Sequence, residues 1–249
     1  MKLKFIICKD ANDVGKKTAM EIIKLLKLKN DAVLGLATGA TAEVIYPHVI
    51  KSYQKKDIDF KNVRTINLDE YSGLDGKNEQ SYRYFMDKNL FDHININKKN
   101  TFVPKGVGDK DKNLKEFNDK LNKYPRDLQI LGVGSNGHIA FNEPNEVLHA
   151  DALCVKLDDK TIKANSRYFA SEKDVPKEAF SMGMAGILKA KKIVLAAIGK
   201  SKASAIKELL SHDKITTKFP VTFLKLHNDV VVIIDKEIAD SIGLENKKL

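Results

Sequence analysis

The sequence is poor in cysteine and has no long apolar run. Its two cysteines, Cys8 and Cys154, lie in apolar strand-like segments without the spacing of metal ligands, so we expect both to be buried and reduced. No apolar run approaches the length of a membrane span, and Phe5–Cys8 is too short for the core of a signal peptide. We therefore expect a cytoplasmic protein with no membrane partner.

Internal repeats, low-complexity tracts and linkers rich in proline, glycine or serine are also absent. The 249 residues are enough for a full hydrophobic core, and a content of 43% hydrophobic and 31% charged residues is typical of a soluble globular protein. The simplest interpretation is a single domain over residues 1–249.

A compact basic stripe interleaved with aromatic residues is missing too, although the formal net charge is +10. The lysines are scattered among asparagines, as at Lys55-Lys56, Lys98-Lys99 and Lys247-Lys248. This distribution favours a solvated lysine-rich surface over a nucleic-acid interface, so we expect no nucleic-acid partner. A positive field would still favour an anionic substrate.

Strand-like and helix-like segments alternate along the chain, which predicts an α/β fold with a Rossmann-like, open, mostly parallel sheet and helices on both faces. The expected strands are Lys4–Cys8, Ala32–Ala37, Val63–Leu68, Leu128–Val133, Lys192–Ile198 and Val230–Ile234, with an extra strand at Leu153–Leu157. The expected helices are Ala11–Leu28, Thr41–Gln54, Ser81–Leu90, Asp111–Tyr124, Lys177–Lys189 and Ser201–Ser211. Ser81 and Ser201 are expected helix N-caps.

The most informative segment is the glycine-rich stretch Leu131–Pro144, which follows an apolar run typical of a buried strand. Glycines let a small polar ligand approach the backbone closely, because no Cβ is present. His138 and Glu143 in this loop offer a proton-transfer pair at the carboxyl end of a strand, where open α/β sheets bind ligands. The alternative is a glycine turn that holds a structural histidine.

The same segment matches the dinucleotide-binding fingerprint at Gly132-Val-Gly134-Ser-Asn-Gly137, and Asp158 lies near the offset of a ribose-binding acid. That fingerprint requires a helix that begins inside the loop. Here the loop continues to Pro144, which would break such a helix. The sequence therefore disfavours a dinucleotide site.

Two further motifs follow predicted strands. Thr38-Gly39-Ala-Thr41 forms a strand-to-helix turn whose backbone N–H groups and hydroxyls suit a phosphate, although a threonine N-cap would look the same. Asp69 and Glu70 are adjacent carboxylates at a strand end, where one could act as a general base. The alternative is an aspartate that caps a helix or a turn.

Two cationic motifs complete the set. Arg167 offers a planar fork for bidentate phosphate contact. Lys202 lies in a second strand-to-helix turn, Gly199-Lys-Ser-Lys202. Taken singly, each is better explained as a surface charge. A Schiff base on Lys202 would need an apolar pocket that nothing nearby predicts.

In this order the motifs resemble those of the glucosamine-6-phosphate deaminase family, from about Val33 to Ile234. The matching pieces are Leu36-Ala-Thr-Gly39, Asn67-Leu-Asp-Glu-Tyr71, Gly134-Ser-Asn-Gly-His-Ile-Ala-Phe-Asn-Glu-Pro144, Ala164-Asn-Ser-Arg167 and Gly199-Lys-Ser-Lys202. The resemblance implies an enzyme of amino-sugar catabolism that converts D-glucosamine 6-phosphate and water into D-fructose 6-phosphate and ammonia. It implies no metal ion and no organic cofactor.

The resemblance also assigns roles to matching residues. Asp69 would move a proton from C2 to C1, His138 would shuttle the proton that opens the pyranose ring, and Glu143 would hold the imidazole. The phosphate-binding residues would be Thr38, Gly39, Thr41, Arg167 and Lys202.

Two departures from the family matter. Asn136 stands where many members have aspartate, so it can hydrogen-bond an imidazole but cannot stabilise its protonated form with a full charge. The segment Asn145–Lys156 lacks the cations with which hexameric members bind an effector phosphate. We therefore expect a monomer or a small homo-oligomer without allosteric activation.

Two other functions remain to be distinguished. The 6-phosphogluconolactonases share the fold, but they would not require the base at Asp69. A sugar-phosphate sensor would call for a helix-turn-helix at one end of the chain, and neither end of the sequence has room for one.

Overall fold

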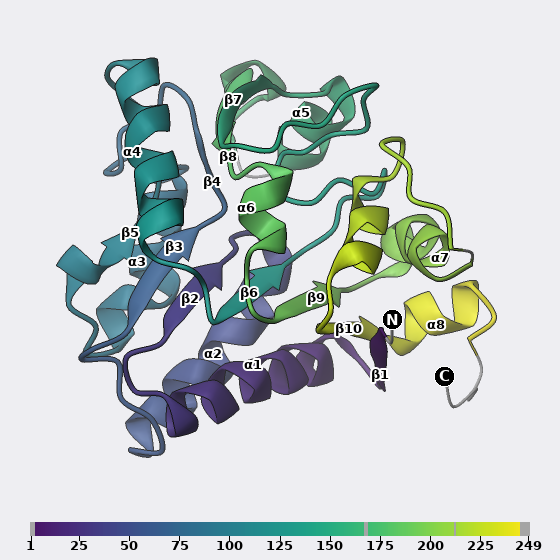
Figure 1. Ribbon diagram of the computed structural model, residues 1–249, viewed down its shortest axis with the longest axis horizontal. Coiled ribbons are helices and arrows are strands. Elements are labelled where there is room, and N and C mark those ends of the chain that lie inside the picture. The colour runs from purple at the N-terminus through teal and green to yellow at the C-terminus, as the bar shows by residue number, and fades with distance from the viewer. Residues whose placement is uncertain (1–2, 167–168, 212, 245–249) are drawn as a thin grey trace.

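The computed structural model describes residues 3–166, 169–211 and 213–244, and its centre is a seven-stranded sheet (Figure 1). The strands are β1 (Lys4–Cys8), β2 (Val33–Leu36), β3 (Arg64–Asn67), β5 (Thr101–Phe102), β6 (Leu128–Leu131), β9 (Ile193–Ala197) and β10 (Val230–Asp235). They run parallel in the order β1-β10-β9-β6-β2-β3-β5.

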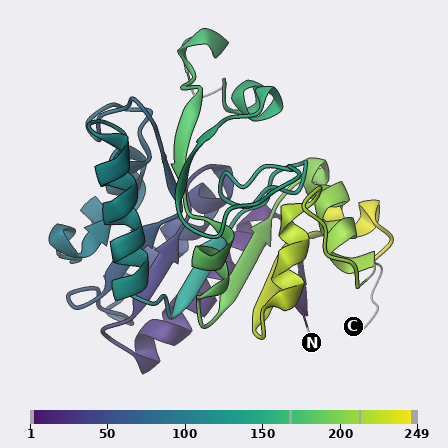
Figure 2. The same ribbon diagram turned by 45° about the horizontal axis from the view of Figure 1, so that its top comes forward.

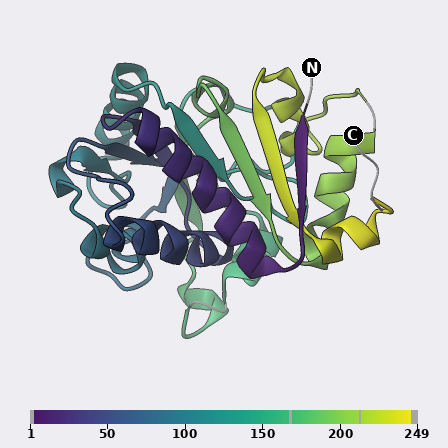
Figure 3. The same ribbon diagram turned by 90° about the horizontal axis from the view of Figure 1, so that it is seen from below.

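The central strands are apolar because helices cover both faces of the sheet. Every residue of β9 and β10 is buried, as expected of parallel strands between two helical layers. The helices α1 (Ala11–Leu28) and α2 (Ala40–Gln54) lie side by side over one face (Figure 3). On the other face lie α4 (Lys110–Lys123) and α6 (Met184–Leu188), which Figure 2 shows in front of the sheet. The predicted α/β fold is confirmed.

The remaining helices connect the strands at the edges of these layers. They are α3 (Tyr82–Asn89), α5 (Asp159–Asn165), α7 (Ala203–Ser211) and α8 (Lys236–Ser241), with 3₁₀ turns η1 (Phe91–His93), η2 (Lys98–Asn100), η4 (Glu172–Asp174), η5 (Lys200–Lys202) and η6 (Pro220–Leu226). Ser81 caps α3, because its side chain accepts a hydrogen bond from the Tyr84 N–H group. The expected N-cap at Ser201 is wrong, since Ser201 lies inside η5, whose N-cap is Gly199.

A second, antiparallel sheet projects beyond the main one (Figure 2). Its strands are β4 (Asp69–Tyr71), β7 (Leu153–Lys156) and β8 (Glu178–Ser181), in the order β4-β8-β7. β7 confirms the predicted extra strand. Both β4 and β7 pair with β8 in antiparallel fashion. Local sequence could not indicate these pairings, because the paired strands are far apart in the chain.

The expected helix Lys177–Lys189 is wrong, since the segment divides into β8 and the short α6. Its apolar residues have helical spacing, but pairing with β4 and β7 on both sides outweighs that local preference. Gly183 separates the two elements. A Cβ atom there would lie 2.1 Å from the Asp151 carbonyl oxygen, so the chain passes too close to its neighbour for a larger residue.

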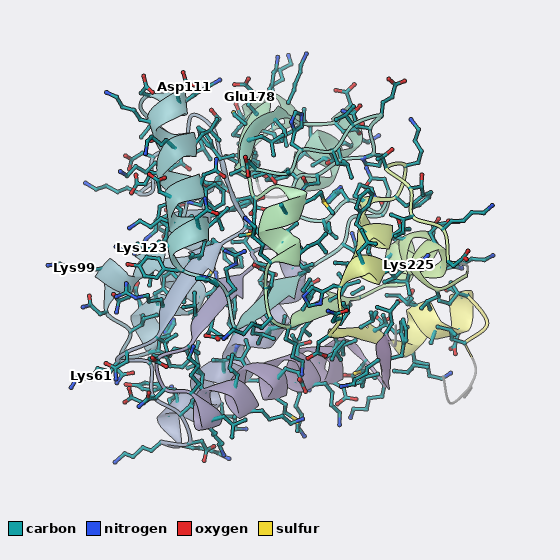
Figure 4. All side chains as sticks on the ribbon, viewed as in Figure 1. Lys61, Lys99, Asp111, Lys123, Glu178 and Lys225 are labelled. Atoms are coloured by element: carbon teal, nitrogen blue, oxygen red, sulfur yellow. The ribbon has the colours of Figure 1, made fainter. Side chains whose placement is uncertain are left out.

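Charged side chains surround this core on every visible side, and Figure 4 shows Lys61 and Lys99 pointing outward. Of the described helices, none has both the length and the apolar composition needed to cross a bilayer. Both cysteines are free thiols; Cys8 is buried as expected, but Cys154 is only partly buried. The expectation for Cys154 fails because its strand lies at the edge of the small second sheet.

Candidate active site

Four of the sequence motifs meet because their strands are neighbours. β9, β6, β2 and β3 are adjacent in the sheet, and the chain leaves each of them at the same edge. Since β3 lies on one side of β2 while β6 and β9 lie on the other, this edge contains a topological switch point, where open α/β sheets bind ligands. A cavity of about 810 Å³ opens there. Its lining includes the predicted site residues Thr38, Gly39, Thr41, Asp69, Asn136, His138 and Lys202.

The His138 imidazole is held by a hydrogen-bonded carboxylate. Glu143 Oε2 lies 3.1 Å from His138 Nδ1 and accepts a 2.7 Å bond from the side-chain amide of Asn136. Asn136 Oδ1 in turn accepts a 3.2 Å bond from the backbone N–H group of His138. A carboxylate at Nδ1 favours a proton on that nitrogen, so Nε2 remains to exchange a proton with a ligand.

The electrostatics of Glu143 suit this holding role. Burial disfavours its ionised form, but the interactions with His138, Thr161 and Asn136 outweigh burial and lower the pKa of Glu143 below its ordinary value. The carboxylate is therefore ionised at neutral pH. An ionised partner stabilises the positive charge that appears on His138 when the ring takes up a proton.

Gly134 is required because the imidazole lies directly over it. A Cβ atom on Gly134 would lie 2.3 Å from Cε1 and 2.4 Å from Nδ1 of His138, distances far below van der Waals contact. The Gly134 N–H group also donates a 2.9 Å hydrogen bond to the His138 carbonyl, which closes the loop. No helix begins between Gly132 and Pro144, so the prediction that this loop does not open a helix is confirmed.

Asp69 presents its carboxyl group to the same cavity. It begins β4, immediately after β3, and is only 8% exposed. Its carboxyl group has no hydrogen-bond partner among the described residues. Burial raises the pKa of Asp69 to about 8, and the charge of Glu70 adds to this rise. A carboxyl group that changes protonation near neutral pH is suited to take up and return a proton.

The neighbouring Glu70 has a different environment and a different task. Its carboxylate accepts hydrogen bonds from the backbone N–H groups of Tyr71, Tyr82 and Arg83, at 2.8 to 2.9 Å. Burial raises the pKa of Glu70 to about 7, against the opposing effect of these three donors. Glu70 thus ties the first turn of α3 to β4, and Tyr82 of that turn lines the cavity.

The same cavity is also lined by the N-terminus of α2, which offers backbone N–H groups. Gly39 is the N-cap of this helix, has φ +83° and makes no side-chain cap. The alternative of a threonine N-cap is therefore wrong, and the Thr38 and Thr41 side chains lie in the cavity lining instead. A helix N-terminus with adjacent hydroxyls is suited to an anion.

The second turn contributes Lys202, which is half-buried and lines the cavity. Gly199 opens this turn with φ +84°, and its N–H group donates a 2.6 Å hydrogen bond to Asp235 Oδ2. The other oxygen of Asp235 caps α8. Asp235 thus fixes the turn that carries Lys202, a contact that the sequence alone did not indicate.

Neither Arg167 nor Asp158 is among the described residues that line the cavity. Arg167 lies outside the described residues, and the first two residues of its motif, Ala164 and Asn165, end the helix α5. Asp158, considered as a ribose-binding acid, is exposed. Thr161, by contrast, was missed: it comes from α5, is buried, and donates a 2.5 Å hydrogen bond to Glu143 Oε1. Among the described residues, no group of three or more His, Cys, Asp or Glu side chains could hold a metal ion.

Comparison with known proteins identifies the family to which this chain belongs. The family model for glucosamine-6-phosphate isomerases and 6-phosphogluconolactonase matches residues 9–233. A glucosamine-6-phosphate deaminase of Clostridium beijerinckii is 48% identical over 242 residues, which cover 96% of this chain and 100% of that protein.

Solved structures agree with the sequence comparison. A structure described as a monomeric glucosamine-6-phosphate deaminase aligns with a TM-score of 0.92 at 38% identity, covering 96% of this chain and 100% of that one. A 6-phosphogluconolactonase from Thermotoga maritima aligns with a TM-score of 0.75 at 17% identity, covering 94% and 100%. The second likeness is one of fold alone.

Proposed function

This chain belongs to the glucosamine-6-phosphate isomerase/6-phosphogluconolactonase family, and we propose that it acts in it as a glucosamine-6-phosphate deaminase. The reaction converts D-glucosamine 6-phosphate and water into D-fructose 6-phosphate and ammonia. The observation that carries the proposal is the pairing, in one cavity, of the buried carboxyl of Asp69, which has no hydrogen-bond partner among the described residues, with the carboxylate-held imidazole of His138.

The first chemical task is to open the sugar ring. His138 moves the proton from the C1 hydroxyl to the ring oxygen, which breaks the bond between C1 and that oxygen and gives the open-chain aldehyde. Because Nδ1 of the imidazole is bonded to Glu143, Nε2 is the atom that takes up the proton and releases it. A positioned imidazole typically contributes about 10²–10⁴-fold to such a step.

The second task is to move a proton between adjacent carbons. Ionised Asp69 takes the proton from C2, and the aldehyde oxygen gains a proton from the substrate's protonated 2-amino group, which gives a neutral enolamine. Asp69 then returns the proton to C1, leaving an iminium at C2. Water adds to this carbon and ammonia leaves, which produces fructose 6-phosphate. One carboxyl group serves both transfers because it regains its starting charge.

The phosphate binds away from the reacting carbons. The α2 N-terminus at Gly39, the hydroxyls of Thr38 and Thr41, and the charge of Lys202 form its site, to which the family resemblance adds Arg167. Anchoring the substrate at this end holds C1 and C2 at Asp69, so that binding energy is used for orientation.

The biological setting follows from the same proposal. We infer a cytoplasmic enzyme of amino-sugar catabolism in which residues 1–249 act as one domain. It works as a monomer or small homo-oligomer with hyperbolic kinetics, because the segment 145–156 has no cluster of cations for an effector phosphate. A sigmoidal substrate curve that N-acetylglucosamine 6-phosphate makes hyperbolic would contradict this part.

Lactone hydrolysis is the function to separate from deamination, because the fold is shared. We expect kcat/KM for glucosamine 6-phosphate to exceed that for 6-phosphogluconolactone by at least about 10³-fold, the scale of general-base catalysis by Asp69. Purified enzyme assayed with each substrate at one pH tests this. A preference for the lactone would overturn the proposal.

Asn136 should influence the pH dependence of the reaction. In Asn136→Asp, a carboxylate replaces the amide that donates to Glu143 Oε2, so a second negative charge adjoins the His138–Glu143 pair. The added negative charge disfavours ionisation of Glu143 and favours the protonated form of the His138 imidazole. We predict that the acidic limb of the kcat/KM profile moves to higher pH, measured from pH 5 to 9. An unchanged profile would show that Asn136 does not act on the pair.

A further inference from the structure

Thr161 connects the helix α5 to the catalytic loop. α5 lies beside the second sheet (Figure 1), between β7 and β8 in the chain, and 18 residues separate Thr161 from Glu143. Thr161 is only 5% exposed, and its hydroxyl donates a 2.5 Å hydrogen bond to Glu143 Oε1. A buried hydroxyl that points at a charged group of the active site needs an explanation.

The two oxygens of Glu143 have different partners. Oε2 receives the Asn136 amide and faces His138 Nδ1, and both of those residues belong to the same loop as Glu143. Oε1 has one hydrogen-bond donor within the described part of the chain, the Thr161 hydroxyl. Without that donor, the carboxylate plane could rotate about its terminal bond, which would turn Oε2 away from Nδ1 and loosen its hold on the imidazole.

We propose that Thr161 is a positioning residue of this active site, whose hydroxyl fixes the plane of the Glu143 carboxylate and through it the orientation of the His138 imidazole. The inference depends on the proposed deaminase function only where the test measures enzyme activity. It also makes the helix α5 part of the catalytic arrangement, since the carboxylate is fully held only when α5 is packed in place.

The alternative is that Thr161 merely anchors α5. The neighbouring residue Ile162 provides a matched control, because it packs against the apolar cluster around Tyr71 and Phe141 and makes no hydrogen bond to Glu143. If anchoring were the role of Thr161, shortening Ile162 would reproduce the effect of losing the hydroxyl.

The experiment compares Thr161→Val, Thr161→Ser and Ile162→Val with the unmodified protein. Thr161→Val keeps the shape and removes the hydroxyl, and we expect kcat to fall by about 10–100-fold, the scale known from the partners that orient histidines in metal sites, with little change in KM. The acidic limb of the kcat profile should move to higher pH, because a donor that favours ionised Glu143 is gone. Among the described residues, His138 is the titratable side chain in hydrogen-bond contact with that carboxylate.

Thr161→Ser keeps the donor and should restore the pH profile, while Ile162→Val should leave it unchanged. The Nδ1–H NMR signal of His138 gives a readout without substrate, and we expect it to broaden by solvent exchange in Thr161→Val alone. The proposal is overturned if that signal and the pH profile are unaffected in Thr161→Val, or if Ile162→Val changes them equally. If the unmodified protein does not convert glucosamine 6-phosphate, the proposed function fails, and the NMR comparison still tests the role of Thr161.

Discussion

Replacing Asp69 with asparagine is expected to lower kcat by about 10²–10⁴-fold, the usual contribution of a positioned general base. Asparagine has nearly the same shape but cannot accept the C2 proton. KM should change little, because the proposed phosphate site at the α2 N-terminus and Lys202 is not altered. Steady-state kinetics over a range of substrate concentrations separate the two effects.

The same substitution should stabilise the protein at alkaline pH. Burial raises the pKa of Asp69 from 3.8 to about 8, so the folded state binds this proton more tightly than the unfolded state does. Stability from this group is therefore present at low pH and is lost as pH rises from about 4 to about 8. The side chain of the replacing asparagine carries no charge at any pH. We expect Tm at pH 8.5 to rise by about 4–8 °C, which corresponds to roughly 2 kcal/mol at this chain length, and to change little at pH 4.

Asp127 provides the control with the opposite sign. It is also buried, but the side chains of Lys29 and Lys191 and the Val33 N–H group donate to it and outweigh burial, which lowers its pKa. Asp127→Asn should therefore reduce Tm at neutral pH and leave kcat unchanged. An Asp69→Asn protein with full activity, or with lower Tm at pH 8.5, would contradict the account of Asp69.

Gly134→Ala is expected to lower kcat by about 10²-fold or more, because misplacing a catalytic group by about an ångström has effects of that size. The new methyl group would overlap the His138 ring, whose Cε1 atom lies 2.3 Å from its position. The ring must turn away or the loop must shift, and either movement separates Nδ1 from Glu143. The fold should survive, since the cavity offers room for the displaced ring.

Gly132 in the same loop is the matched control, because nothing lies within 4 Å of a Cβ atom placed there. Gly132→Ala should change kcat far less than Gly134→Ala does. The Nδ1–H signal of His138 should be altered only in the latter variant. Equal losses in the two variants would mean that loop flexibility, and not the position of the imidazole, controls the activity.

The meeting of Asp69 and His138 in one cavity could be predicted because the sheet does most of the positioning. The alternation of strand-like and helix-like segments indicated a mostly parallel sheet, and parallel neighbours bring Asp69 and His138 to one edge whatever the details of their loops. Glu143 could be predicted for a different reason, since it lies only five residues after His138 in the same loop.

What could not be predicted depends on contacts between distant segments. The strand β8 has apolar residues at helical spacing and becomes a strand only because β4 and β7 pair with it. Three contacts of the site join separate elements of the chain. They link Glu70 to the first turn of α3, Asp235 to Gly199, and Thr161 to Glu143. Nothing in the local pattern around Thr161 distinguishes it from an ordinary residue of an amphipathic helix.

The most direct test of the central claim is to treat the purified protein with EDTA, add glucosamine 6-phosphate and measure ammonia and fructose 6-phosphate in the same samples. A metal-independent deaminase that isomerises its substrate predicts equimolar products that accumulate together, at a rate that falls by about 10²-fold or more in Asp69→Asn. Ammonia without fructose 6-phosphate, or no turnover by the unmodified protein, would contradict it.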